Sequence, residues 1–151
     1  MINARVVYDH VTPKLRSLVR DPLRAKLVME AIGEHLANST RERFLDTKTD
    51  PDGVPWTPNA ETTVAKKGHD DILIDTETLA QSPDYDVVGM SSVVIGHAYN
   101  FPTAPGVTAA IHQLGGVSGR NYATKIPQRA FFGVSDDDVS AIERILDVYM
   151  Q

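Results

Sequence analysis

A long amphipathic segment in the N-terminal third of the chain constrains the fold more than any other feature. Asp21-Pro22 has the signature of a helix start, with an N-capping aspartate followed by proline at the first helical position. The helix is predicted to run to about Leu45 and to pack by one face, because its apolar residues recur at multiples of four. These residues are Val28, Ile32, Leu36 and Phe44. Gly33, in the middle of the helix, costs about 1 kcal/mol there and indicates a place where another backbone comes close.

The apolar pattern changes after Asp71, where short β-branched and aliphatic runs replace the helical period. The runs at residues 72–74, 87–88 and 92–97 predict extended segments. Residues 89–92 have the character of a hairpin connection. The connections are too short for parallel crossovers, so the strands are predicted to form an antiparallel meander, with residues 76–84 as a short strand or a turn.

The C-terminal segment from Ser135 to Tyr149 is predicted to be a helix. Ser135 as N-cap and Asp138 three residues later form a capping box, and Asp136 and Asp137 add favourable charge to the first turn. The predicted fold class is therefore α+β, with an antiparallel sheet of about four strands flanked by the long N-terminal helix and the C-terminal helix. The 151 residues are predicted to form a single domain.

Shorter helices and loops complete the predicted order. Helices are expected at 12–19, 60–67 and 107–114, and loops at 46–59, 100–106 and 115–119. Gly68 is expected to end the second of these helices. The first loop holds the only tryptophan, Trp56, which either pins the loop to the core or fills a pocket on a partner, with pinning favoured. The segment GGVSG at 115–119 is interpreted as a flexible loop.

The composition limits the classes of function that fit. The chain has no cysteine, so it has no disulfide framework, thiolate nucleophile or cysteine-based metal site. Its net charge of −5 is a poor match to duplex DNA, and no run of residues approaches a membrane span. Charge is uneven: residues 1–67 carry +2, whereas residues 68–151 carry −7. Two such faces can attract each other between neighbouring copies.

Two functional alternatives can be written from the charged and histidine residues. His97 and His112 could meet Asp75 or Asp86 and form the centre of a small metal-dependent hydrolase, although no ligand spacing supports it. The long helix could instead present a basic face to DNA. Its candidate contacts are Arg20, Arg24, Lys26, Arg41 and Arg43.

Ordered motifs along the chain resemble the phage virion morphogenesis family, the tail completion proteins of contractile-tailed phages and prophages. The motifs are Pro51–Trp56 (PDGVPW), Thr62-Thr63 with Lys66-Lys67, Ile72–Thr76 with Leu79 and Ser82, Val94–Gly96, Ala110–Gly116 (AIHQLGG), and Ile126–Gly133 (IPQRAFFG). The chain departs from the family at Glu77, where members often carry glycine, and at Ala130, where they often carry proline. It also has an insertion-like segment at 100–109 that displaces Tyr99.

The resemblance implies a non-enzymatic virion component without a cofactor. Such a protein caps the tail tube or joins it to the head connector, as a ring of about six identical subunits. Its implied partners are other copies of the chain, tail tube or terminator proteins and head connector proteins. It is assembled in the cytoplasm of the bacterial host and resides in the tail or neck of the virion. Membrane binding and tight nucleic-acid binding are not expected, although DNA passes through such a ring.

The loops at 46–59 and 115–126 are the expected contacts with neighbouring subunits or tail proteins. Arg129 is either an interface anchor among aromatic residues or an arginine snorkelling from an edge strand. The candidate interface residues are Pro51, Asp52, Gly53, Trp56, His112, Gln113, Gly115, Gly116, Pro127, Arg129 and Phe131.

Overall fold

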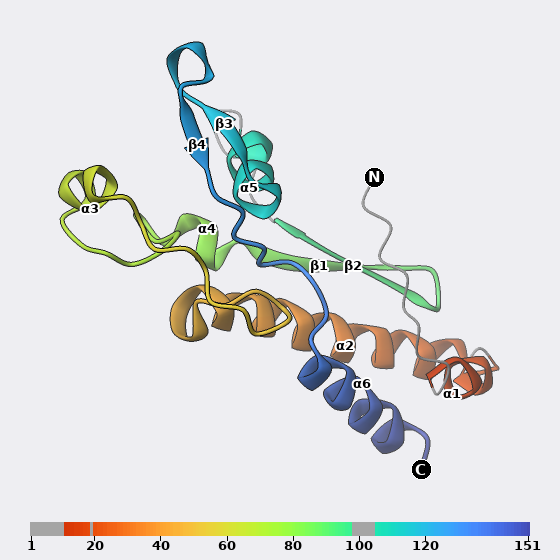
Figure 1. Cartoon of the computed structure of the whole chain (residues 1–151). Coiled ribbons are helices and arrows are strands. Elements are labelled where there is room, and N and C mark those ends of the chain that lie inside the picture. The colour runs from red at the N-terminus through yellow and green to blue at the C-terminus, as the bar shows by residue number, and fades with distance from the viewer. Residues whose placement is uncertain (1–10, 19, 98–104) are drawn as a thin grey trace.

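The long helix α2 (Pro22–Glu42) is the element on which the rest of the protein packs (Figure 1). The computed structural model describes residues 11–18, 20–97 and 105–151. Asp21 caps α2 as predicted, since its side chain accepts a hydrogen bond of 3.1 Å from the Arg24 N–H. The helix continues into a π-helical turn, η1 (Arg43–Thr47), which ends at Lys48 in a left-handed conformation. The short helix α1 (Val11–Leu18) lies near the start of α2 (Figure 1).

A β-hairpin covers one side of α2. Strands β1 (Pro83–Val88) and β2 (Ser92–His97) are antiparallel, with Val87 opposite Val93. These two valines pack on the core of α2, while the alternate residues of both strands face outward. Gly33 is required by this contact, because a Cβ there would lie 2.2 Å from Cδ2 of Tyr85. The predicted close approach at Gly33 is therefore made by an aromatic ring, and the expectation of another backbone was wrong.

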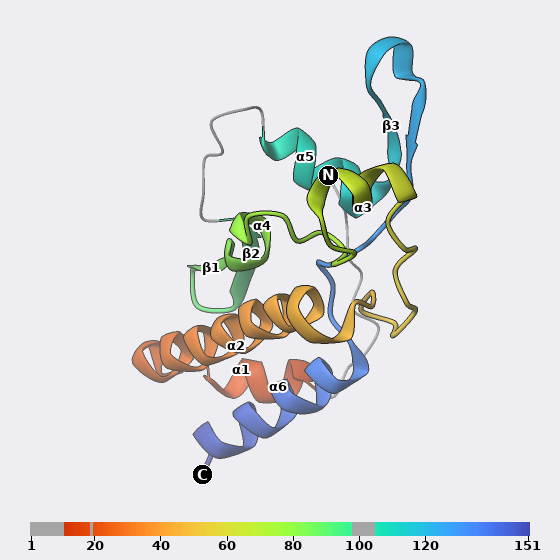
Figure 2. The same ribbon diagram turned by 90° about the vertical axis from the view of Figure 1, so that its left-hand side faces the viewer.

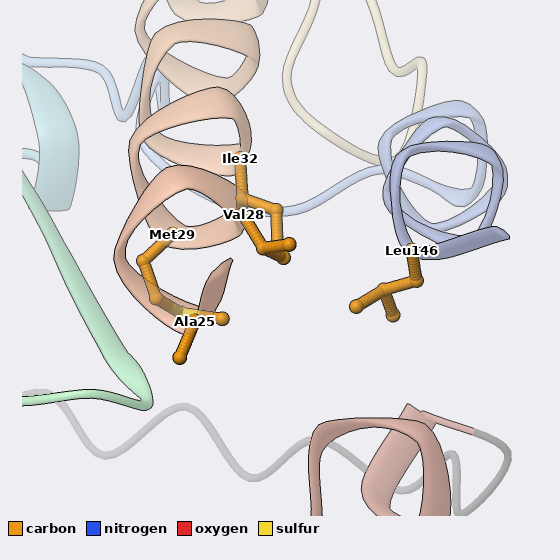
Figure 3. Close-up of a cluster of buried hydrophobic side chains, with 5 residues drawn as sticks. All are labelled: Ala25, Val28, Met29, Ile32 and Leu146. Carbon is orange, nitrogen blue, oxygen red and sulfur yellow. The ribbon is translucent and has the colours of Figure 1, made fainter. Parts of the chain in front are cut away.

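Helix α6 (Asp136–Tyr149) packs against α2 on the side away from the hairpin (Figures 1 and 2). The predicted capping box is present: Ser135 Oγ accepts from the Asp138 N–H, and the Asp138 carboxylate accepts from the Ser135 N–H. Leu146 of α6 points toward α2 and is fully buried (Figure 3). It completes a core cluster with Ala25, Val28, Met29 and Ile32.

A second core cluster lies at the C-terminal end of α2. It joins Phe44 to four buried residues from distant parts of the chain, Trp56, Ala80, Ala109 and Phe131. Helices α4 (Thr78–Gln81) and α5 (Pro105–Leu114) contribute Ala80 and Ala109 to it, whereas α3 (Glu61–Lys67) has no buried residue. Gly68 ends α3 in a left-handed conformation, as predicted.

A second hairpin projects from the body of the protein (Figure 2). Strands β3 (Gly116–Ser118) and β4 (Thr124–Ile126) are antiparallel, and the 3₁₀ turn η2 (Arg120–Tyr122) lies at the tip. We call residues 114–126 the arm. Almost every residue of the arm is exposed.

The α+β class, the antiparallel strands and the two flanking helices are confirmed, but the arrangement of the strands differs from the prediction. The predicted single meander is replaced by two separate two-stranded sheets. Residues 72–74 form no strand, because Leu73 has a left-handed φ of 58° and the three side chains turn toward the second core cluster. The segment 115–119, predicted to be a flexible loop, contains β3. The segment 76–84 contains α4 and the start of β1, and most of the loop predicted at 100–106 lies outside the described residues.

Candidate assembly surfaces

Gln113 ties the end of α5 to the segment that leads from the arm to α6. We call this segment, Ile126–Gly133, the strap. The Gln113 side-chain oxygen accepts hydrogen bonds from the N–H groups of Phe131 (3.0 Å) and Phe132 (2.9 Å), and its amide donates to the Phe132 carbonyl (3.1 Å). The carbonyl of His112 accepts a further bond of 2.7 Å from the Arg129 N–H. The motif that ends α5 and the motif of the strap, which lie on either side of the β3–β4 hairpin in the sequence, therefore form one hydrogen-bonded unit.

Arg129 connects the strap to the loop that follows Trp56. Its guanidinium donates to the carbonyls of Thr57 (2.8 Å) and Pro58 (2.9 Å), and the residue is 6% exposed. Burial lowers the pKa of Arg129 from its usual value, although a guanidinium remains charged at neutral pH. The arginine therefore fixes the loop within its own chain.

Trp56 pins the loop at 46–59 to the core, as the favoured interpretation predicted. Its indole N–H donates to the Ala130 carbonyl at 2.9 Å, and the ring is 5% exposed. The ring contacts Phe44 edge-on at a centroid distance of 5.6 Å, and Phe44 in turn lies 4.8 Å from the ring of Phe131. The tip of the loop remains outside, where Asp50 Oδ1 accepts from the N–H groups of Asp52 and Val54.

A buried ion pair locks the start of α6 onto the end of α2. Arg43 Nη2 lies 2.7 Å from Asp138 Oδ2, and Arg43 Nη1 donates to the carbonyls of Phe131 and Gly133. His35 Nε2 lies 2.9 Å from the other carboxylate oxygen. Burial raises the pKa of Asp138, but hydrogen bonds from Ser135 and Ser39 and the charge of Arg43 outweigh it and lower the pKa below its usual value.

The structure divides the predicted interface residues into three groups by their exposure. Trp56, Arg129 and Phe131 are buried, and their contacts lie within the chain. Pro51, His112, Gln113, Gly115 and Pro127 are half-buried, whereas Asp52, Gly53 and Gly116 are exposed. The first group holds the loops in place, and the exposed group lies on surfaces that a partner can reach.

Glycine is favoured at three places in this framework. Gly115 has φ of 74°, and a Cβ there would lie 3.1 Å from the backbone nitrogen of Gln128. A Cβ on Gly133 would lie 2.4 Å from Cγ of Pro51. Glu77, the position where family members often carry glycine, has the left-handed φ of 60° that glycine adopts most readily.

The two histidines of the hydrolase alternative do not build a metal centre among the described residues. His97 Nδ1 lies 2.5 Å from the hydroxyl of Ser82, and the His97 ring packs on Phe132 at 4.9 Å. Burial lowers the pKa of His112, and the charge of Arg129 lowers it further, so its imidazole is neutral near pH 7. No group of three potential metal ligands occurs within residues 11–18, 20–97 and 105–151.

Four of the five basic candidate residues of the long helix have a polar partner among the described residues. Arg43 is buried against Asp138, and Arg41 donates to Asn38 and to the Pro83 carbonyl. Arg24 and Lys26 lie within 4 Å of the carboxylates of Asp21 and Glu30. Among the described residues, three of the five candidate positive charges lie near carboxylates, whereas Arg41 bonds to neutral groups and Arg20 is exposed without an ion pair.

Both hairpins carry exposed apolar residues that no other described element covers. The first such surface is the arm, where Val117 and Tyr122 are 52% and 76% exposed. The second is the outer face of the β1–β2 hairpin, where Val88 and Val94 are 56% and 54% exposed. The sequence indicated the first surface through the loop predicted at 115–126. The second surface was not predicted, although Asp84 and Asp86 alternate with Tyr85 and Val87, a pattern that indicates one outward and one inward face.

In the part of the chain that the structure describes, no helix is long and apolar enough to cross a membrane.

Comparisons with known proteins give one match. No curated protein and no solved structure matches the chain. The model of the phage virion morphogenesis family matches residues 6–151, which is nearly the whole length. The protein therefore belongs to the phage virion morphogenesis family.

Proposed function

We propose that this protein completes the phage tail and joins it to the head, as a ring of identical subunits at the head-proximal end of the tail. Membership of the virion morphogenesis family supports a structural role in phage assembly. Tail completion, head–tail joining and the ring are our proposal. Its partners would be the tail tube or terminator protein on one side and the head connector on the other.

The pair of uncovered surfaces is the observation that carries the proposal. A hairpin whose strands have three residues each, such as β3–β4, buries little surface by itself and is marginally stable when isolated. Here it is held at its base by the bonds of Gln113 to the strap and by the bond from the Arg129 N–H to the His112 carbonyl. A rigidly based, exposed arm is suited to contact a neighbouring protein.

A ring uses two different surfaces of each subunit. In a ring of identical copies, every contact joins one surface of a subunit to a different surface of the next. The chain has segments of opposite charge. Residues 68–86 contain acidic but no Lys or Arg side chains, whereas residues 120–135 contain Lys and Arg but no acidic side chains. Phage DNA would pass through the lumen without tight binding.

The experiment is a null allele in a phage that encodes this chain, with lysates examined by negative-stain electron microscopy. The expected result is filled heads and separate tails, with joined particles restored when the wild-type gene is supplied from a plasmid. An Arg16→Gln gene is a suitable positive control, because this exposed residue forms no ion pair among the described residues. Infectious, joined virions from the null allele would refute the proposed function.

A further inference from the structure

We propose that the arm of one copy docks on the outer face of the β1–β2 hairpin of a second copy. This inference rests on the proposed ring, and it assigns the two surfaces that meet at each subunit boundary. The occupant of the hairpin face is therefore another molecule of the same chain.

One face of the arm combines an apolar residue with a cation. Val117 is paired with Lys125 across the two strands, so both side chains lie on the same face. Both residues are exposed, and the tip adds Arg120 and Tyr122. The arm contains no Asp or Glu. It therefore presents valine, tyrosine and two positive charges to a partner.

The outer face of the β1–β2 hairpin has the same arrangement with the opposite charge. Asp86 is paired with Val94, and Asp84 and Val88 lie two residues away on the same face of β1. A Cβ built on Gly96, which is paired with Asp84, would meet no heavy atom within 4 Å. No element among the described residues covers this face, and it offers two valines and two negative charges.

The four charged side chains on these surfaces form no ion pair within the described part of the chain, although Asp84 Oδ1 accepts a hydrogen bond of 2.9 Å from the Tyr85 N–H. Neither Arg120 nor Lys125 forms an ion pair there, and neither does Asp84 or Asp86. Opposite unpaired charges beside exposed valines are complementary in both sign and polarity. Docking Val117 on Val94 would bring Lys125 toward Asp86 and exclude water from both valines.

Three other acidic residues, Asp71, Asp138 and Asp147, fit the arm less well because each has a basic side chain within 4 Å. Asp147 of α6 lies 2.5 Å from Lys14 Nζ, and Asp71 lies 3.4 Å from His69 Nδ1. Asp138 is buried against Arg43. The hairpin face alone combines unpaired carboxylates with exposed β-branched residues on a sheet among these positions. The arm and the hairpin are also different surfaces, as a closed ring requires.

Charge reversal tests the contact directly. One variant carries Arg120→Glu and Lys125→Glu, and the other carries Asp84→Lys and Asp86→Lys. Solution mass is measured by light scattering over a concentration series at low salt. Each variant alone should associate at least about tenfold more weakly than wild type, because like charges then face each other. A matched control carries Arg16→Glu and Arg20→Glu. Its net charge differs from that of wild type by the same amount as the net charge of the arm variant does, and it should associate as wild type does.

An equimolar mixture of the two reversed variants supplies the decisive readout. The negative arm of one variant fits the positive hairpin of the other, and the positive arm of the second fits the negative hairpin of the first. The mixture should therefore recover an assembly in which the two variants alternate. Circular dichroism should show that each variant is folded. Wild-type association by both reversed variants, or failure of the mixture to recover, would overturn the inference.

Cysteine cross-linking detects the contact even if it is too short-lived to be seen by light scattering. The chain has no cysteine, so introduced thiols are the only ones present. Lys125→Cys and Asp86→Cys molecules, mixed under mild oxidation, should form the mixed disulfide dimer at least about threefold above a Lys66→Cys and Asp86→Cys control pair. Equal yields from the two pairs would overturn the docking. The proposed function would survive that result, because it is tested separately by the null allele.

Discussion

Arg43 Nη2 lies 2.7 Å from Asp138 Oδ2, and neither residue has more than 5% of its surface exposed. The two residues are 95 positions apart in the sequence. Their contact fixes the end of α2 against the start of α6, and the same guanidinium holds the Phe131 carbonyl at the end of the strap. The Arg43 guanidinium therefore anchors both the strap that follows the arm and the start of the C-terminal helix.

Replacing Arg43 by methionine should destabilise the protein strongly. The Arg43→Met variant keeps apolar volume but leaves the Asp138 carboxylate buried with one partner fewer, which costs about 3–5 kcal/mol. Urea unfolding followed by circular dichroism measures this loss. The control is Arg144→Met on the exposed side of α6, where a change within about 0.5 kcal/mol is expected. A loss below about 1 kcal/mol in Arg43→Met would contradict the role given to the ion pair.

The stability of the protein should fall in acid partly through Asp138. Its pKa in the folded state is lowered from the usual value of 3.8, so the stabilisation is present above that value and is lost as pH falls through the folded pKa. The free energy of unfolding should therefore decrease from about pH 4.5 downward. An Asp138→Asn variant, less stable at neutral pH, should show a shallower decrease. Parallel pH curves for the two proteins would rule out this contribution.

The contact between Gly33 and Tyr85 predicts a reversal of the usual helix preference. Alanine favours a helix over glycine by about 1 kcal/mol, but Gly33→Ala should destabilise this protein because the new methyl meets the tyrosine ring. In a Tyr85→Ala background the same change should become stabilising by up to about 1 kcal/mol. The four proteins form a double-mutant cycle measured by urea unfolding. The absence of a change in sign would show that the ring moves away at little cost.

Gln113 should matter more than its partial exposure suggests. Gln113→Ala leaves the N–H groups of Phe131 and Phe132 without their acceptor, at a cost of about 1–3 kcal/mol. The fluorescence of Trp56, the only tryptophan, reports the change because its indole bonds to the strap at Ala130. Gln128→Ala serves as the control, since Gln128 is exposed and donates only to a carbonyl. Equal losses in the two variants would argue against a special role for Gln113.

Glycine at position 77 should be tolerated or stabilising. Glu77 has φ of 60°, a conformation that costs an ordinary residue roughly 1 kcal/mol, so Glu77→Gly should raise the free energy of unfolding by up to about 1 kcal/mol. The matched control is Glu34→Gly, an exposed position within α2, which should lose about 1 kcal/mol. Thermal unfolding of both variants gives the comparison. Destabilisation of equal size at the two positions would contradict the assigned backbone strain.

Local chemistry made several elements predictable from the sequence. The caps at Asp21 and Ser135 are formed by residues three positions apart, so their signatures are complete in a short stretch of chain. The hairpin of β1 and β2 is similarly local. The apolar run at 72–74 misled the prediction, because its side chains complete a core cluster whose other members are distant in sequence. Tertiary contacts decide the conformation of such a short run.

The inward roles of the candidate site residues could not be predicted. Arg129 was expected on an interface or an edge strand, yet its carbonyl partners are more than 70 residues away. A sequence motif shows that Gly, Pro and aromatic residues are needed together, but it does not show whether they face a neighbour or their own core. The outer face of the β1–β2 hairpin was not predicted, because the sequence does not show that no other described element packs on it.

Electron cryomicroscopy of purified virions from a phage that encodes this chain tests the proposed ring most directly. We expect density for several copies of the chain in a ring between the tail tube and the head connector, with the arm of each copy against the β1–β2 hairpin of the next. Density for the chain at the baseplate or on the capsid, or single isolated copies at the neck, would contradict it.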